Sequence, residues 1–295
     1  QTDFFSESVK NVKEKIHKCT ICNTLTEDDV CTICNSNLRD SEVLCVVENT
    51  KNLILYELDI KLPVEATSHR SVRVGDKVYI FGGTNTKTRL DTIVMHDLTN
   101  QTIEVLDVKL PHGLNCSQVG QYGNKIFLLG GYKGSIINTI ILFDSETYEV
   151  KILEETLPIS IFKGAWCTVG KYVYIIGGTT GPRLTSIYRF DMETYEVKLM
   201  NGTLTHQVSQ GRAIYDGEGN IYIYGGTNEA NELQDAIFKY NIEQDVCIEL
   251  EYTLPIPLAN ICVANTINGI FILGGDNNKL DIIIRQNGEE FEFLM

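Results

Sequence analysis

Two Cys-x2-Cys pairs, separated by eight residues, are the part of this 295-residue chain with the clearest potential for chemistry. Each pair can present two thiolates to one ion, and the spacer is long enough for the chain to turn back and close a tetrahedral site. Two independent redox dithiols are the alternative, but such close spacing favours a shared metal. Four sulfur ligands leave no open position for water or substrate, so we expect one structural zinc ion. Its predicted ligands are Cys19, Cys22, Cys31 and Cys34.

The other five of the nine cysteines are scattered among apolar residues. An odd total without regular spacing does not fit a disulfide framework, and it favours a reducing compartment in which thiols stay free. We therefore expect a cytoplasmic protein in which these five side chains act as small core hydrophobes. They are Cys45, Cys116, Cys167, Cys247 and Cys262.

Common catalytic motifs are missing from the sequence. There is no Gly-x-Ser-x-Gly, no P-loop, no His-Glu-x-x-His and no glycine-rich dinucleotide fingerprint, and the five histidines are isolated from one another. These observations favour a binding protein over an enzyme.

Composition and charge narrow the range of partners. An apolar share of 43% with 22% charged residues is typical of a globular chain. The formal charge of -14 and a pI near 4.8 should repel nucleic acid and anionic membranes overall. No apolar run approaches the roughly 20 residues that cross a bilayer, and no secretion signal is present, so we expect a soluble protein with no membrane partner. The sequence begins with Gln1 rather than methionine, from which we expect a fragment or a processed product.

A repeat of nearly fifty residues fills the rest of the chain. Glycine doublets recur at intervals of 47 to 49 residues, and each ends a short β-rich run such as Val78–Phe81. A hairpin turn precedes that run, and a polar loop, a third strand and a fourth strand follow it. Each repeat therefore predicts one four-stranded antiparallel blade. The third strand ends in an aromatic or imidazole side chain plus Asp or Asn, at His96-Asp97, Phe143-Asp144, Phe190-Asp191 and Tyr240-Asn241.

With these doublets and pairs, and with Tyr148 and Tyr195 placed in the fourth strands, residues 41–295 resemble the kelch family of β-propellers. The resemblance implies an all-β propeller of five full four-stranded blades from about residue 66. A half blade precedes them, because the ending Leu58–Pro63 matches Leu106–Pro111.

Residues 9–48 resemble a second family, the bacterial recombination mediator RecR. The match includes a helix leading into the first cysteine pair, the spacer Leu25–Asp28, the second pair and the run Cys45–Glu48. It implies a structural zinc in a small module over residues 1–40 and the first strand of a Toprim domain. No Asp-x-Asp follows to complete an acidic magnesium site. A DNA-repair or recombination accessory is therefore an alternative function, with nucleic acid an unlikely partner that only this module could contact.

We expect a propeller to bind through the loops that join second to third and fourth to first strands, because these emerge on one face. Cations gathered there could hold an acidic peptide or a carboxylate. The hypothesis is a non-catalytic scaffold for a protein or peptide partner; a propeller sugar enzyme similar to sialic acid mutarotases is the second alternative. The candidate contact residues are Ser68, Arg89, Tyr132, Lys133, Lys163, Arg183, Gln210, Arg212 and Asn228.

Overall fold

The computed structural model describes residues 62–266, 269–276 and 282–294, together with residues 17–18, 25–26 and 29. The chain divides into two units, Gln1–Leu62 and Pro63–Met295. In the first unit, β1 (His17–Lys18) pairs antiparallel with β2 (Leu25–Thr26). The predicted half blade and the predicted domain boundary at residues 40 and 41 lie outside the described residues.

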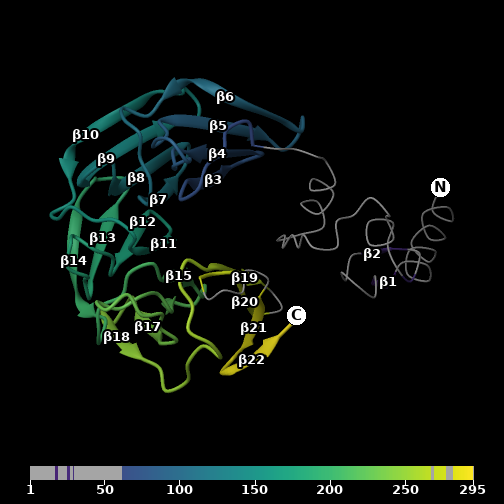
Figure 1. Cartoon of the computed structure of the whole chain (residues 1–295), viewed down its shortest axis with the longest axis vertical. Helices are drawn as coiled ribbons and strands as arrows, with labels where there is room; N and C mark the ends of the chain where they lie inside the picture. The colour runs from purple at the N-terminus through teal and green to yellow at the C-terminus, as the bar shows by residue number, and fades with distance from the viewer. Residues whose placement is uncertain are drawn as a thin grey trace, which may run out of the picture. The chain divides into compact units, whose positions relative to one another are not determined.

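The second unit is a propeller of five blades, each a four-stranded antiparallel sheet. This confirms the predicted fold class. The first strands lie innermost and the fourth strands outermost (Figure 1). In chain order the blades are β3 (Arg70–Val74), β4 (Lys77–Phe81), β5 (Thr92–Asp97) and β6 (Thr102–Lys109); β7 (Gln118–Tyr122), β8 (Lys125–Tyr132), β9 (Ile136–Asp144) and β10 (Val150–Thr156); β11 (Ala165–Val169), β12 (Tyr172–Ile176), β13 (Ser186–Asp191) and β14 (Val197–Thr203); β15 (Arg212–Tyr215), β16 (Asn220–Tyr224), β17 (Ile237–Asn241) and β18 (Val246–Glu249); and β19 (Cys262–Thr266), β20 (Gly269–Leu273), β21 (Ile283–Asn287) and β22 (Glu290–Phe293).

The pair that ends each third strand has two separate structural roles. In blades 2 to 4 the aromatic member is buried, since Phe143, Phe190 and Tyr240 are all fully inaccessible, whereas His96 of blade 1 is half-buried. The acid that follows accepts hydrogen bonds in the next turn, as when Asp191 Oδ1 accepts from the backbone N–H groups of Glu193 and Thr194 at 2.9 and 3.2 Å. One residue therefore packs between blades while its neighbour stabilises the hairpin to the fourth strand.

The glycine doublets join each blade to the next. Gly82 has φ +57°, and a Cβ there would meet the carbonyl oxygen of Leu114 in the following blade. The N–H of Gly83 donates to that same carbonyl at 2.8 Å, and the doublets of the next three blades make equivalent bonds. A side chain would prevent this close approach, which explains why the residue type recurs.

A second set of hydrogen bonds links the blades around the axis. The residues two positions before the inner strands of the five blades all have φ between 52 and 61°. In blades 2 to 5 this residue donates its backbone N–H to the carbonyl of the corresponding residue in the preceding blade, over distances of 2.8 to 3.2 Å. The five residues, which we call the inner ring, are Ser68, Cys116, Lys163, Gln210 and Asn260. Among the described residues the series begins at Ser68 and ends at Asn260.

Two details differ from the predictions. Tyr148 and Tyr195 precede the fourth strands, at φ +59 and +65°, because their rings stack on Phe143 and Phe190 across the hairpin turn. The scattered cysteines are not all core residues: Cys167 is buried as expected, but Cys262 is exposed on β19 of the last blade, and the remaining two that the structure describes, Cys116 and Cys247, are half-buried.

Two further expectations concern the burial of Cys45 and the absence of a membrane-spanning segment. Cys45 lies outside the described residues. The described part of the chain contains no helix long and apolar enough to span a membrane.

Candidate functional site

A cavity of about 490 Å³ opens where the inner strands of all five blades begin. All five inner-ring residues line it, so three of the predicted contact residues, Ser68, Lys163 and Gln210, lie together here, as does a fourth, Arg212. The bridges Thr67 to Thr84 and Phe162 to Thr179 pair the two loop types within a blade, as expected for loops on one face. The rest of the lining consists of the other two inner-ring residues, Cys116 and Asn260, and of His69, Arg70, Gly164, Trp166, Gly211 and Ile261.

Two arginines of this cavity share one aromatic ring. The guanidinium carbons of Arg70 and Arg212 lie 4.5 and 4.4 Å from the ring centroid of Trp166. Arg70 donates from Nε to the carbonyl of Ser117 at 2.5 Å and from Nη1 to its neighbour's carbonyl at 2.8 Å, whereas Arg212 donates from Nε to the carbonyl of Ile261 at 3.1 Å. These backbone bonds orient both guanidinium groups, because the guanidinium is planar and its donors have a fixed geometry.

The charged side chains among the described residues that line the cavity are cationic. Burial, and then the charge of Arg212, lowers the pKa of Arg70 to about 10, and burial also lowers the pKa of Arg212. With a pKa of about 10, Arg70 remains charged at neutral pH. Burial and the adjacent Arg70 lower the pKa of His69, against the opposing effect of its hydrogen bond to Ala66, so this imidazole stays neutral. No aspartate or glutamate is among the described residues that line the cavity.

Outside the cavity, the loops of blades 1 to 3 carry a run of aromatic and cationic contacts. The Arg89 guanidinium lies 4.5 Å from the ring centroid of Tyr132, whose ring is 5.6 Å from that of Phe162. The ammonium of Lys163 lies 5.5 Å from the ring of Phe162 and so connects this run to the cavity. Lys133 is exposed beside it.

Two predicted contact residues are bonded within the loops instead. The guanidinium of Arg183 donates to Thr227 Oγ1 at 2.9 Å and to Asn231 Oδ1 at 2.8 Å in the next blade. Asn228 donates to Glu232 Oε2 at 2.8 Å, and its own Oδ1 accepts from backbone N–H groups of that loop. The bonds of Arg183 connect the loops of blades 3 and 4, those of Asn228 stay within its own loop, and both side chains are less available to a partner.

Sequence reasoning missed Arg70 and the role of Trp166. Arg70 stands in blade 1 where Arg212 stands in blade 4, each two residues after its inner-ring residue and each opposite the residue before the glycine doublet, Phe81 or Tyr224. An alignment of the repeats would have found the second arginine. Trp166 is shifted by one position along its strand, so no repeat signal indicates that it lies between them.

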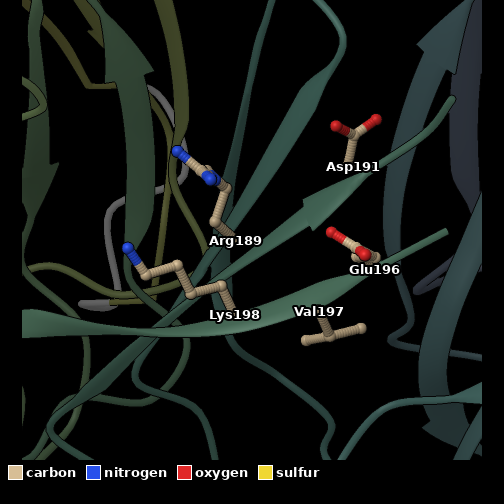
Figure 2. A pocket seen from close by; sticks show the side chains of 5 residues that line it. All are labelled: Arg189, Asp191, Glu196, Val197 and Lys198. Atoms are coloured by element: carbon tan, nitrogen blue, oxygen red, sulfur yellow. The ribbon is translucent and has the colours of Figure 1, made fainter. Parts of the chain in front are cut away.

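A second pocket, of about 420 Å³, lies over β13 and β14 of blade 3. Figure 2 shows Arg189 and Lys198 extending to one side of it, and Asp191 and Glu196 grouped on the other. Since Asp191 also pairs with Lys171 at 3.2 Å and accepts from its own turn, the charges here are matched locally. This pocket does not gather groups around one point, and the central cavity is the better candidate.

The four predicted zinc ligands lie outside the described residues. In sequence, β1 and β2 flank Cys19 and Cys22, so the backbone pairs antiparallel on either side of the first thiolate pair. Elsewhere in the described chain, no group of three or more His, Cys, Asp or Glu side chains could hold a metal ion.

Comparison with protein families identifies both parts of the chain. The model of the KLHDC2/KLHL20/DRC7 kelch-repeats domain matches residues 113–285, which is more than half of the chain. The model of the RecR four-cysteine zinc finger domain matches residues 16–36, which include all four cysteines of the two pairs.

Curated relatives of this chain include RecR proteins, which match it over short stretches. The recombination protein RecR of Lactobacillus johnsonii is 43% identical over 53 residues, which is 18% of this chain and 27% of the relative. The RecR of Treponema denticola is 50% identical over 42 residues, or 14% of this chain and 22% of the relative. The chain thus spans about a quarter of the length of these relatives.

Proposed function

Since the chain belongs to the kelch-repeat propeller family, we propose that it recognises a protein or peptide partner through the loop face, meaning the cavity and the loops around it, without turnover. The observation that carries the proposal is the charge of this face. In a chain of formal charge -14, Arg70, Lys163 and Arg212 meet at one cavity that no described carboxylate lines. Such a site favours an anionic group of a partner.

Aromatic and cationic side chains extend the proposed surface outward. Tyr132 is half-buried and is flanked by Arg89 and Phe162, which gives a rigid side chain with both apolar and polar contacts to offer. Tyrosine and arginine are the residue types that most often dominate binding energy at protein interfaces. We therefore propose the cavity as the anchor point and this aromatic run as the adjoining contact.

Charge reversal tests the proposal. The triple variant Arg89→Glu, Lys133→Glu and Arg212→Glu should abolish capture of partners that the wild-type protein retains in a pull-down with quantitative mass spectrometry. The matched control is Arg73→Glu, Lys151→Glu and Lys198→Glu, which reverses three charges on exposed strand positions away from the cavity. Equal capture by the triple variant and the wild type would overturn the assignment.

For the N-terminal module, we propose one structural zinc ion held by Cys19, Cys22, Cys31 and Cys34. The proposal is supported by the match of residues 16–36 to a four-cysteine zinc finger. Four thiolates saturate a tetrahedral ion and leave no site for catalysis. We further propose that the protein acts in the cytoplasm, where unpaired thiols stay reduced.

The resemblance to RecR supports a second candidate, a DNA-repair accessory. Fluorescence anisotropy of gapped and single-stranded DNA, titrated with the zinc-loaded protein at low and physiological salt, tests it. The net negative charge predicts flat curves. Micromolar binding that disappears in the Cys19→Ser, Cys22→Ser variant would favour this candidate over the first.

A further inference from the structure

The two guanidinium groups at the central cavity have unused hydrogen-bonding capacity. Backbone carbonyls take Nε and Nη1 of Arg70 and Nε of Arg212. The outer donors of Arg212 and Nη2 of Arg70 make no hydrogen bond to any described residue, and neither arginine has an ion pair within the described chain. The cavity lining thus holds Nη2 of Arg70 and the outer donors of Arg212 without an acceptor among the described residues.

Holding these like charges together is unfavourable unless an anion balances them. The two guanidinium groups share the Trp166 ring, and both arginines are half-buried, so water screens their charges less than at an exposed position. A buried charge without a partner costs several kcal/mol in general. The ring of Trp166 offsets part of this cost through cation–π attraction, and Lys163 adds a third positive charge to the lining.

We infer that the cavity binds a phosphate monoester, with Arg70 and Arg212 donating to its oxygens and Lys163 beside them. This inference deepens the proposed function, on which it rests for the loop face as the binding surface. A monoester carries close to two negative charges at neutral pH and three acceptor oxygens, so it suits two guanidinium groups and an ammonium better than a single carboxylate does. A volume of about 490 Å³ accommodates this group with the small molecule or side chain that bears it.

The single tryptophan of the chain provides a direct readout. Because Trp166 is the only Trp and touches both arginines, its fluorescence should respond when an anion draws the guanidinium groups away from the ring. Inorganic phosphate, sulfate and acetate are titrated into the full-length protein at constant ionic strength. We expect a saturable change with phosphate, and an affinity for acetate at least about tenfold weaker, since acetate carries one charge and two acceptor oxygens.

Variants separate specific binding from general charge effects. Arg212→Gln should weaken phosphate binding by roughly tenfold or more, which is the effect of losing a charged hydrogen-bond donor. Arg73→Gln is the matched control, since it removes the same charge from an exposed position three residues along the inner strand from Arg70. It should bind phosphate as the wild type does. A response that is absent, equal for acetate, or equally weakened by Arg73→Gln would overturn the inference.

Two further ligands identify the source of the group. A blocked peptide with one central phosphoserine that binds more tightly than phosphate would assign the cavity to a phosphorylated partner. Tighter binding of glycerol 2-phosphate than of the peptide would assign it to a small phosphorylated metabolite. Because this titration needs no partner protein, its failure leaves the charge-reversal test of the loop face unaffected.

Discussion

Removing one inter-blade aromatic ring should destabilise the whole propeller. Phe190 is fully buried at the end of β13, with its ring centroid 5.4 Å from that of Phe127 in the preceding blade and 6.5 Å from that of Tyr195. Both contacts, and the surrounding aliphatic cluster that includes Val173, belong to the layer between blades 2 and 3. Truncation to alanine leaves a cavity there, because the sheets on either side are hydrogen-bonded and cannot collapse inward.

For Phe190→Ala we expect a loss of about 3–5 kcal/mol in the free energy of unfolding, the range for a buried phenylalanine. For a domain of this size each kcal/mol lowers the melting temperature by about 2–4 °C, so the midpoint should fall by roughly 10 °C. Urea titration followed by circular dichroism measures the first quantity, and a thermal scan measures the second. Leu199→Ala is the control, because Leu199 lies in the same blade but is 57% exposed; its effect should stay within about 0.5 kcal/mol. A loss below about 1 kcal/mol for Phe190→Ala would refute the assignment of this ring to the packing between blades.

Three other changes test separate features. Burial alone would raise the pKa of Asp245, but the hydrogen bonds that it accepts from blade 3 and from its own blade lower this pKa. The carboxylate therefore stabilises the fold fully above its unfolded pKa, and this stabilisation is lost as pH falls toward its folded pKa. Asp245→Asn should cost about 1–3 kcal/mol at neutral pH and flatten the acid side of a curve of stability against pH. Gly177 has φ +60° and lies against a carbonyl of the next blade, so Gly177→Ala should lower the free energy of unfolding by about 2 kcal/mol or more. Gly170 has φ +57° but faces open space, so Gly170→Ala should cost only about 1 kcal/mol. Equal losses for the two variants would contradict the role of close approach between blades. Cys31→Ser should reduce zinc content measured by mass spectrometry, and Cys262→Ser on exposed β19 should not.

The strand pattern could be predicted because its causes are local. Alternating apolar residues, a turn and a glycine doublet recur in each repeat, and each of the five full repeats forms four strands in the structure. The pairs from His96-Asp97 to Tyr240-Asn241 end their strands as expected, since burial of one side chain and capping by the next both act over a few residues.

The candidate site could be predicted only in part, because it depends on contacts between blades. Arg212 was identified from its loop, but the contact of Arg70 with Trp166 joins strands of blades 1 and 3, and no short-range pattern encodes it. Arg183 was expected to face a partner, yet its guanidinium bonds to loop groups of the next blade, including Asn231. Loop conformation determines which cations stay available, and the repeat does not specify it.

The inner ring shows how one backbone design leaves room for a specific site. Its five residues share the same left-handed φ and the same chain of inter-blade hydrogen bonds, yet they carry five different side chains, from the hydroxyl of Ser68 to the ammonium of Lys163. Glycine would adopt this φ at lower cost, but none of the five blades has one there. Because the backbone alone makes these hydrogen bonds, the side chains of the inner ring are free to vary, and they line the cavity. A ligand would therefore recognise an asymmetric site that these side chains form together with Arg70 and Arg212.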